Sequence, residues 1–128
     1  MVIDASAAVR TLDRDPAALQ LRARMQATEC HAPHLYDAEI GHVVRGHERA
    51  GRLEPDEAAR ALAELTALID HRYPHVGALA ARAWSLRHNL SFYDGLYAGL
   101  AAALDVPLLT HDARVRRAPD LPCRVELV

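Results

Sequence analysis

Two carboxylates in this 128-residue sequence stand just beyond short apolar segments, a position where side chains of an α/β protein can do chemistry. Asp4 follows the apolar pair 2–3, and Asp112 is separated by one residue from the apolar run 106–110. In open α/β sheets, sites form beyond the carboxyl ends of the strands. If the two strands are parallel neighbours, both carboxylates lie at one edge of the sheet. Taken alone, each position favours a helix N-cap, which does not exclude metal binding because a carboxylate has two oxygens.

Glu39 is a third acid whose position needs an explanation. Leu35, Glu39 and Val43 are spaced four residues apart in a predicted helix and therefore share one face. The apolar residues at positions 40 and 44 flank that line, so we expect it to be the apolar side of the helix. A carboxylate there must be paired, protonated or bound to a metal, because burying it alone is costly. An arginine partner would make it a structural ion pair, which is the alternative.

Asp94 is the fourth acid, at the entry to a predicted helix, where its charge would also suit the helix dipole. Crowded carboxylates raise one another's pKa and destabilise a site unless a cation neutralises them. Mg²⁺ and Mn²⁺ prefer oxygen ligands, lower the pKa of bound water and position it against phosphorus. The sequence contains no lysine, which excludes mechanisms that need a catalytic one. The four acids therefore predict metal-assisted phosphodiester hydrolysis, in which Glu39 holds an ion or orients the attacking water.

Short apolar segments that alternate with helices predict an α/β fold with a mostly parallel sheet. The predicted strands are 2–3, 30–32, 72–74, 106–110 and 125–127. The predicted helices are 5–12, 16–28, 34–50, 55–69, 76–88 and 93–104, with a helical turn from residue 112. The segment 72–74 has poor strand propensity and is placed only by its position between helices. Without repeats or linkers, residues 1–128 are expected to form one domain.

The composition is that of an ordinary soluble protein, with 51% hydrophobic and 25% charged residues. A formal net charge of -2 does not by itself indicate a nucleic-acid binder. No apolar run reaches the length of about 20 residues that spans a membrane, and the chain begins without signal-peptide features. We therefore expect a cytoplasmic protein with no membrane partner. Cys30 and Cys123 are expected to be unpaired.

Four segments of the chain together resemble the PIN domain and, within it, the VapC-type toxins of bacterial toxin–antitoxin pairs. They are Val2-Ile3-Asp4-Ala5-Ser6, Ala32-Pro33-His34-Leu35 followed by Glu39-Ile40, Tyr93-Asp94-Gly95-Leu96-Tyr97 with Leu100-Ala101, and Leu108-Leu109-Thr110-His111-Asp112-Ala113-Arg114. The resemblance implies a three-layer fold with a parallel sheet of about five strands in the order 3-2-1-4-5, flanked by helices. It also implies an Mg²⁺- or Mn²⁺-dependent endoribonuclease toxin, a homodimer, and a small VapB-like antitoxin whose C-terminal segment covers the active site.

The resemblance also implies roles for individual residues. The acidic, metal-binding cluster falls on the four acids Asp4, Glu39, Asp94 and Asp112. Ser6 and Thr110 match positions whose hydroxyls support the carboxylates or contact metal-bound water. His42 stands where members of the family often have asparagine, which would make the site more sensitive to pH. His111 adjoins the fourth acid and is expected to line the site.

Several arginines are candidates for RNA contacts, because their forked donors suit phosphate oxygens. They are Arg10, Arg14, Arg45 and Arg114. The alternative is that they are solvated surface residues that favour helix C-termini. Trp84 is expected in the core or in a dimer interface.

Other functions were weighed against the same residues. A phosphoacceptor receiver domain needs a lysine, an Asp-x-Asp phosphatase needs an aspartate where Ser6 stands, and a dinucleotide binder needs glycines in its first turn. The alternative that stays open is a catalytically silent PIN-like module that binds protein or RNA. All four acids argue against that module, and His42 keeps it open.

Overall fold

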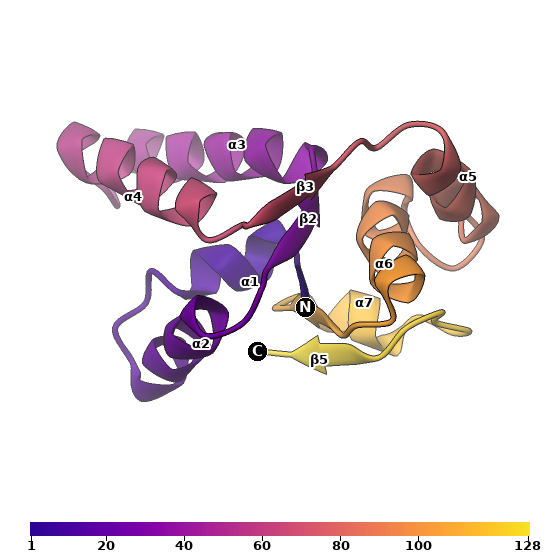
Figure 1. Ribbon diagram of the computed structural model, residues 1–128. Helices are drawn as coiled ribbons and strands as arrows, with labels where there is room; N and C mark the ends of the chain where they lie inside the picture. Colours follow the sequence, from indigo (N-terminus) through magenta and orange to yellow (C-terminus); the bar gives the residue numbers. More distant parts are fainter.

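The computed structural model describes residues 1–128 and contains one parallel sheet in the order β3-β2-β1-β4-β5 (Figure 1). The strands are β1 (Val2–Ile3), β2 (His31–Pro33), β3 (His71–Tyr73), β4 (Leu108–Thr110) and β5 (Val125–Leu127). In this order β1 is central, with Val2 paired to His31 on one side and to Leu108 on the other. The predicted α/β fold and the strand order 3-2-1-4-5 are therefore confirmed.

Helices cover both faces of the sheet. They are α1 (Ala5–Arg10), α2 (Pro16–Gln26), α3 (Leu35–Arg49), α4 (Pro55–Ala67), α5 (Ala78–Ser85), α6 (Phe92–Leu104) and α7 (Ala113–Arg117). Figure 1 shows α1 to α4 on the left of the strands and α5 and α6 on the right, which gives three layers. No helix is both long and apolar enough to cross a membrane.

Local sequence signals explain where several helices begin. The Asp15 carboxylate accepts hydrogen bonds from the backbone nitrogens of Ala17 and Ala18, with Pro16 at the first helical position of α2. The start of α4 carries a reciprocal capping box between Glu54 and Glu57. Both are local devices that need no tertiary contact.

The core fills the space between the sheet and the two helical layers. Its largest fully buried side chains include Ile3, Tyr36, Ile40, Leu96 and Leu108. The Tyr36 hydroxyl donates to the carbonyl of Leu65 at 2.8 Å, which satisfies its polar group inside the core. Because the central strands are covered on both faces, they consist of apolar side chains rather than an alternating pattern.

One helix is shorter than predicted, the weakly predicted strand is confirmed as β3, and Trp84 is at the surface, which leaves the dimer interface of its two expected places. The helix predicted over 76–88 is the shorter α5, because Gly77 adopts a positive φ of 59° directly before it. The segment predicted as a poor strand pairs with β2 as β3 in spite of its propensity, because β2 supplies the hydrogen-bonding edge. Trp84 is not in the core: it is 61% exposed, with the guanidinium of Arg87 over its ring at 5.1 Å.

The helices α5 and α6 approach closely at Gly95. A Cβ added there would lie 3.1 Å from the carbonyl oxygen of Ala83, closer than ordinary packing allows. Gly95 follows Asp94 in the first turn of α6, so this contact fixes the start of the helix that carries the acid. The two cysteines precede β2 and β5, which lie on opposite sides of the central strand β1, and both are unpaired as expected.

Candidate active site

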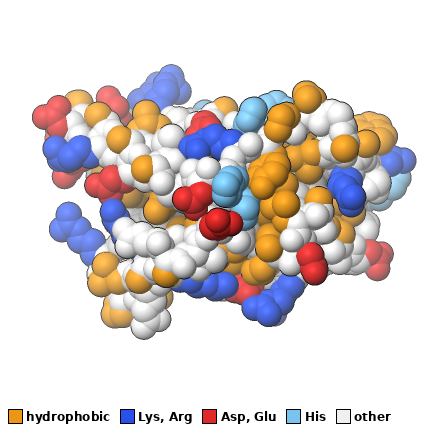
Figure 2. Space-filling view, in the orientation of Figure 1, with side chains coloured by type: hydrophobic (Ala, Val, Ile, Leu, Met, Phe, Trp, Pro, Cys, Tyr) orange, Lys and Arg blue, Asp and Glu red, His pale blue; other side chains and the backbone are white.

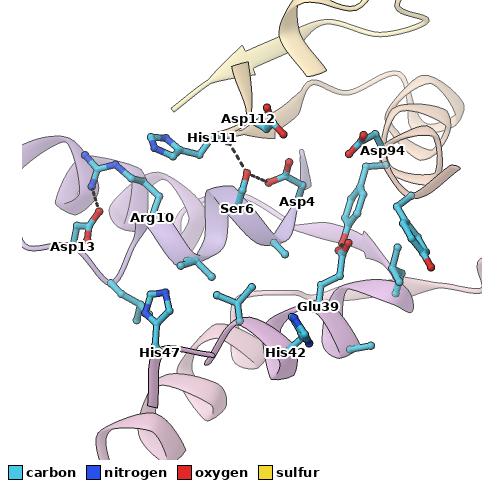
Figure 3. Close-up of a pocket in the computed structure, with 18 of the residues that line it drawn as sticks. Asp4, Ser6, Arg10, Asp13, Glu39, His42, His47, Asp94, His111 and Asp112 are labelled. Atoms are coloured by element: carbon cyan, nitrogen blue, oxygen red, sulfur yellow. Dashed lines mark hydrogen bonds and ion pairs between the residues drawn. The ribbon is translucent and has the colours of Figure 1, made fainter. Parts of the chain in front are cut away.

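A cavity of about 1120 Å³ opens at the carboxyl ends of β1 and β4. Its 20 lining residues include all four predicted acids: Asp4, Glu39, Asp94 and Asp112. Figure 3 shows that they come from four different parts of the chain, with the acid of α3 and the acid of α6 approaching from opposite sides. The parallel sheet brings the first and last acids to the same edge because β1 and β4 are hydrogen-bonded neighbours.

Asp4 is both a helix cap and a cavity residue. Its Oδ1 accepts hydrogen bonds from the backbone nitrogen of Ala7 at 2.8 Å and from the hydroxyl of Ser6 at 2.6 Å. Both bonds end on Oδ1, so the cap leaves the second carboxylate oxygen for another ligand. Burial raises the pKa of Asp4, the hydrogen bonds from Ser6 and Ala7 oppose that rise, and the charge of Asp94 adds to it.

The hydroxyls of Ser6 and Thr110 connect the loops after β1 and β4. Ser6 Oγ accepts the backbone N–H of His111 at 2.8 Å and lies 3.3 Å from Thr110 Oγ1. Thr110 is fully buried, and its Oγ1 accepts the backbone N–H of Asp112 at 2.9 Å. These bonds hold the two aspartate-bearing loops in a fixed relation, as a supporting role requires. The ring of His111 contacts the carbonyl of Val128.

Glu39 faces the cavity rather than the core. The fully covered line of α3 consists of Tyr36, Ile40 and Val44, whereas the line through Glu39 is only half-buried and lines the cavity. The buried face of α3 therefore lies one residue later than the face predicted from the sequence. No arginine pairs with Glu39, so the structural ion pair is excluded.

Tyr97 is a cavity residue that the sequence analysis did not select. Its hydroxyl donates a hydrogen bond to Oε2 of Glu39. Burial raises the pKa of Glu39, and the charges of Asp4 and Asp94 raise it further, while the bond from Tyr97 lowers it. The sequence could have predicted that Tyr97 lies in the cavity, because it is three residues from Asp94 and shares one face of α6 with it.

Asp94 is positioned by the start of its own helix. Its backbone nitrogen donates to the hydroxyl of Ser91 at 3.1 Å, and that hydroxyl donates to Oδ2 of Asp94 at 2.7 Å. Ser91 is therefore the N-cap of α6 and also orients the carboxylate. No basic side chain pairs with this acid.

Asp112 differs from the other three acids because an arginine neutralises it. The side chain of Arg114 forks over it, with Nη2 at 2.6 Å from Oδ2. The hydrogen bonds from the side chain and the backbone of Arg114 lower the pKa of Asp112. Three acids thus lie together uncompensated, and the fourth carries its own counter-charge.

The donor set fits a hard divalent cation. All four acids supply oxygen, and two of them have a raised pKa from burial and mutual repulsion, which a cation would relieve. As the side chains stand, no three acidic, histidine or cysteine groups surround a single point closely enough to hold a metal ion. The fit therefore rests on the chemistry of the donors and their shared cavity.

The rest of the cavity runs along α1 and α3 toward the turn between α3 and α4. His42, His47 and Arg52 line it on that side, beside apolar side chains such as Val9 and Leu53. Of these, only His42 was selected from the sequence.

The arginine candidates for RNA contacts are spread over different places. Arg10 lines the cavity, but its guanidinium pairs with Asp13 at 2.9 Å and Asp15 at 2.7 Å. Arg14 and Arg45 are not among the lining residues, and Arg114 lies at the edge of the site through its pair with the fourth acid. On the face shown in Figure 2, arginine and acidic side chains are interspersed and form no basic patch. RNA contacts by these residues stay a prediction.

Comparisons with known proteins agree over the whole chain. A family model described as PIN domain matches residues 1–121. Ribonuclease VapC1 from Mycobacterium tuberculosis (strain ATCC 25618 / H37Rv) is 47% identical, with 99% of this chain and 96% of that protein covered. Ribonuclease VapC9 from the same strain is 41% identical, with 100% and 98% covered.

Solved structures show the same fold at low sequence identity. VapBC2 from Rickettsia felis, bound to a promoter DNA fragment, has a TM-score of 0.70 at 14% identity and covers 99% of this chain and 97% of that chain. DNA-bound VapBC from Salmonella typhimurium has a TM-score of 0.69 at 16% identity, covering 98% and 95%. A toxin–antitoxin complex from Klebsiella pneumoniae has a TM-score of 0.65 at 15% identity, covering 96% and 98%.

Proposed function

Because this chain belongs to the PIN-domain family, we propose that it is an endoribonuclease toxin that hydrolyses RNA phosphodiester bonds and is neutralised by a cognate antitoxin. Its full-length relatives are named ribonucleases, which supports the activity. The observation that carries the proposal is the group of Asp4, Glu39 and Asp94 in one cavity without a cationic partner. Burial and mutual repulsion raise the pKa values of Asp4 and Glu39, and a bound cation would stabilise their charged forms.

The cation that we propose is Mg²⁺ or Mn²⁺, because the donors are carboxylate oxygens only. Asp4, Asp94 and Asp112 would hold it, with Glu39 as a further ligand or as the residue that orients water. When bound, such an ion supplies an activated water and offsets charge on the leaving oxygen of the phosphodiester.

The residues around the acids prepare them for this role. Tyr97 donates to Oε2 of Glu39, which leaves Oε1 to accept a proton from a water molecule positioned against phosphorus. Ser6 and Thr110 keep the loop of Asp4 and the loop after β4 aligned. His42 lies on α3 one turn beyond Glu39, at the cavity wall, where it would meet the RNA rather than the ion.

The antitoxin that we propose is a small VapB-like protein whose C-terminal segment covers the cavity. Structural neighbours of this chain are described as VapBC or toxin–antitoxin complexes. The cavity offers acids at one end for a basic side chain and apolar residues such as Val9, Leu12 and Leu53 for apolar ones. A segment with both kinds of side chain would exclude RNA and metal together.

The chain is also proposed to form a homodimer. Large hydrophobic side chains are exposed near α5 and the start of α6, among them Val76 at 66% and Trp84 at 61%. Figure 2 shows hydrophobic side chains gathered on the right, the side on which Figure 1 places α5 and α6. Exposed apolar surface of this kind is typical of an interface. Sedimentation of the wild type and of Trp84→Glu tests it, with a monomeric variant as the expected result.

The nuclease activity is tested by incubating purified, antitoxin-free protein with total cellular RNA in Mg²⁺ or Mn²⁺, with and without EDTA. A matched pair of variants, Asp4→Asn and Asp56→Asn, separates the site from the surface, because Asp56 is exposed on α4 outside the cavity. Discrete fragments are expected from the wild type and Asp56→Asn, and none with EDTA or from Asp4→Asn. Full cleavage by Asp4→Asn would overturn the assignment of the site.

The second candidate is a catalytically silent module that keeps the fold for binding RNA or protein. It is favoured only by His42, which replaces the asparagine that is frequent in the family. Absence of cleavage from folded protein, with intact structured RNA present, would support this module. Restoring cleavage with His42→Asn would then identify His42 as the cause.

A further inference from the structure

Arg114 occupies both carboxylate oxygens of Asp112. Its Nε and Nη2 lie 3.0 and 2.6 Å from Oδ2, and its Nε and backbone nitrogen lie 3.1 and 2.8 Å from Oδ1. Every donor to this carboxylate therefore comes from one residue. The guanidinium therefore binds the same carboxylate oxygens that would coordinate a metal ion.

Nothing else in the protein holds the Arg114 side chain. Its guanidinium makes no hydrogen bond beyond Asp112, and its side chain is 86% exposed, against 27% for that of Asp112. Exposed ion pairs of this kind are weak, because water solvates the partners well when they separate. The Arg114 guanidinium can therefore move away from Asp112 into solvent at little cost. Asp112 itself stays in place, because its backbone nitrogen donates to Thr110 Oγ1.

The other acids show what the pair does at the site. Asp4, Glu39 and Asp94 lie in the cavity without a cationic partner, so only the fourth acid is already neutralised. A divalent ion that binds these acids would therefore have to displace a protein cation only at Asp112.

We propose that Arg114 is a built-in competitor of the divalent ion, holding Asp112 in the metal-free protein and leaving it when the ion binds. This rests on the proposed function, because it takes the four acids as the metal site. Arg114 is a positioning residue that acts on the metal mainly through Asp112, its only hydrogen-bond partner, although its charge also reaches Asp94. Its effect is to lower metal affinity while keeping the fourth acid oriented and its charge offset.

The test is Mn²⁺ binding to metal-free, full-length protein by calorimetry, with no RNA present. Arg114→Ala is compared with Arg116→Ala, which removes the same charge from the same helix at an exposed residue that forms no ion pair. Arg114→Ala is expected to bind Mn²⁺ about threefold more tightly than the wild type, the size of an exposed ion pair. Arg116→Ala is expected to bind as the wild type does, and circular dichroism checks that both variants are folded.

A double-mutant cycle tests whether the effect passes through Asp112. In the Asp112→Asn background, Arg114→Ala is expected to raise Mn²⁺ affinity by less than it does in the wild type, because only the weaker interaction with Asp94 remains. Equal affinity of the wild type and Arg114→Ala, an equal gain in Arg116→Ala, or a gain that is undiminished in the Asp112→Asn background would each overturn the proposal. No Mn²⁺ binding by the wild type would instead overturn the metal site itself, so the two failures are distinguishable.

Discussion

Asp37 and Glu39 lie two residues apart on α3, and the fold treats their carboxylates in opposite ways. Asp37 is forked by Arg72 at 2.7 and 3.0 Å, and the same guanidinium donates to the carbonyls of Thr66 and Ile69. Glu39 faces two other acids and has only a tyrosine hydroxyl as a partner. The fold thus pairs the Asp37 carboxylate with an arginine and leaves Glu39 without one. Under the proposed function, Glu39 and the two other unpaired cavity acids, Asp4 and Asp94, are available to a ligand.

Replacing a cavity acid should therefore separate function from stability, which is the largest effect that we expect. Asp4→Asn keeps an oxygen that caps α1 but removes the charge, so RNA cleavage should fall by at least about a hundredfold. Without metal, the free energy of unfolding at neutral pH should rise, because burial and Asp94 disfavour the charge of Asp4. Cleavage assays and urea unfolding of the same preparations measure the two changes. A loss of stability together with activity would contradict the comparison.

Arg72→Ala tests the structural role of the ion pair between Arg72 and Asp37. The change removes bonds to the Asp37 carboxylate and to two carbonyls, so it should lower the free energy of unfolding by about 2 kcal/mol. Cleavage by the folded fraction should persist. The control is Arg22→Ala, which breaks the exposed pair with Glu64 and should cost less than about 1 kcal/mol. Equal losses in the two variants would mean that the Arg72 cluster has no special role.

Tyr97→Phe tests whether the partner of Glu39 supports catalysis. Removing the hydroxyl frees the carboxylate to turn, and cleavage should fall by about tenfold, as for other groups that orient a site residue. Tyr73→Phe is the matched control, since its hydroxyl bonds to the ring of His31 outside the cavity. Equal activity of the two variants would show that Glu39 needs no such orientation.

The smallest expected effect is in the pH dependence of stability. The pKa values of Asp4 and Glu39 are raised in the folded protein, so the folded state binds protons more tightly than the unfolded state. The stability that these two groups contribute is present below their ordinary pKa values and is lost as pH rises through the raised ones. Urea unfolding in EDTA across this range should show a decline that is smaller in Asp4→Asn/Glu39→Gln. An identical decline in both proteins would remove the two groups as its cause.

The sequence predicted the fold well because its signals are local or are set by the sheet. Apolar strands alternating with capped helices indicate a parallel sheet, and the order of strands followed from the family resemblance. The helix starts at Pro16 and Pro55 could be read from their caps. Strand β3 and the short α5 were less certain, because pairing with β2 and the backbone at Gly77 decide them rather than propensity.

The candidate site was only partly within reach of the sequence. The four acids could be selected because each follows a strand or opens onto a helix face, and the structure brings them to one cavity. Their hydrogen-bond partners could not be predicted. The bonds from Tyr97 to Glu39 and from Arg114 to Asp112 depend on side-chain directions that the sequence does not specify. The buried face predicted for α3 differs from the observed face by one residue, because apolar residues flank Glu39 on both sides.

The most direct test of the central claim is Mn²⁺ binding by calorimetry to the wild type and to Asp94→Asn. Asp94 has no basic partner, and its backbone capping by Ser91 does not depend on the carboxylate charge. The account predicts that the wild type binds Mn²⁺ and that the variant binds at least about tenfold more weakly. Unchanged binding by Asp94→Asn would show that the uncompensated acids of this cavity are not the metal site.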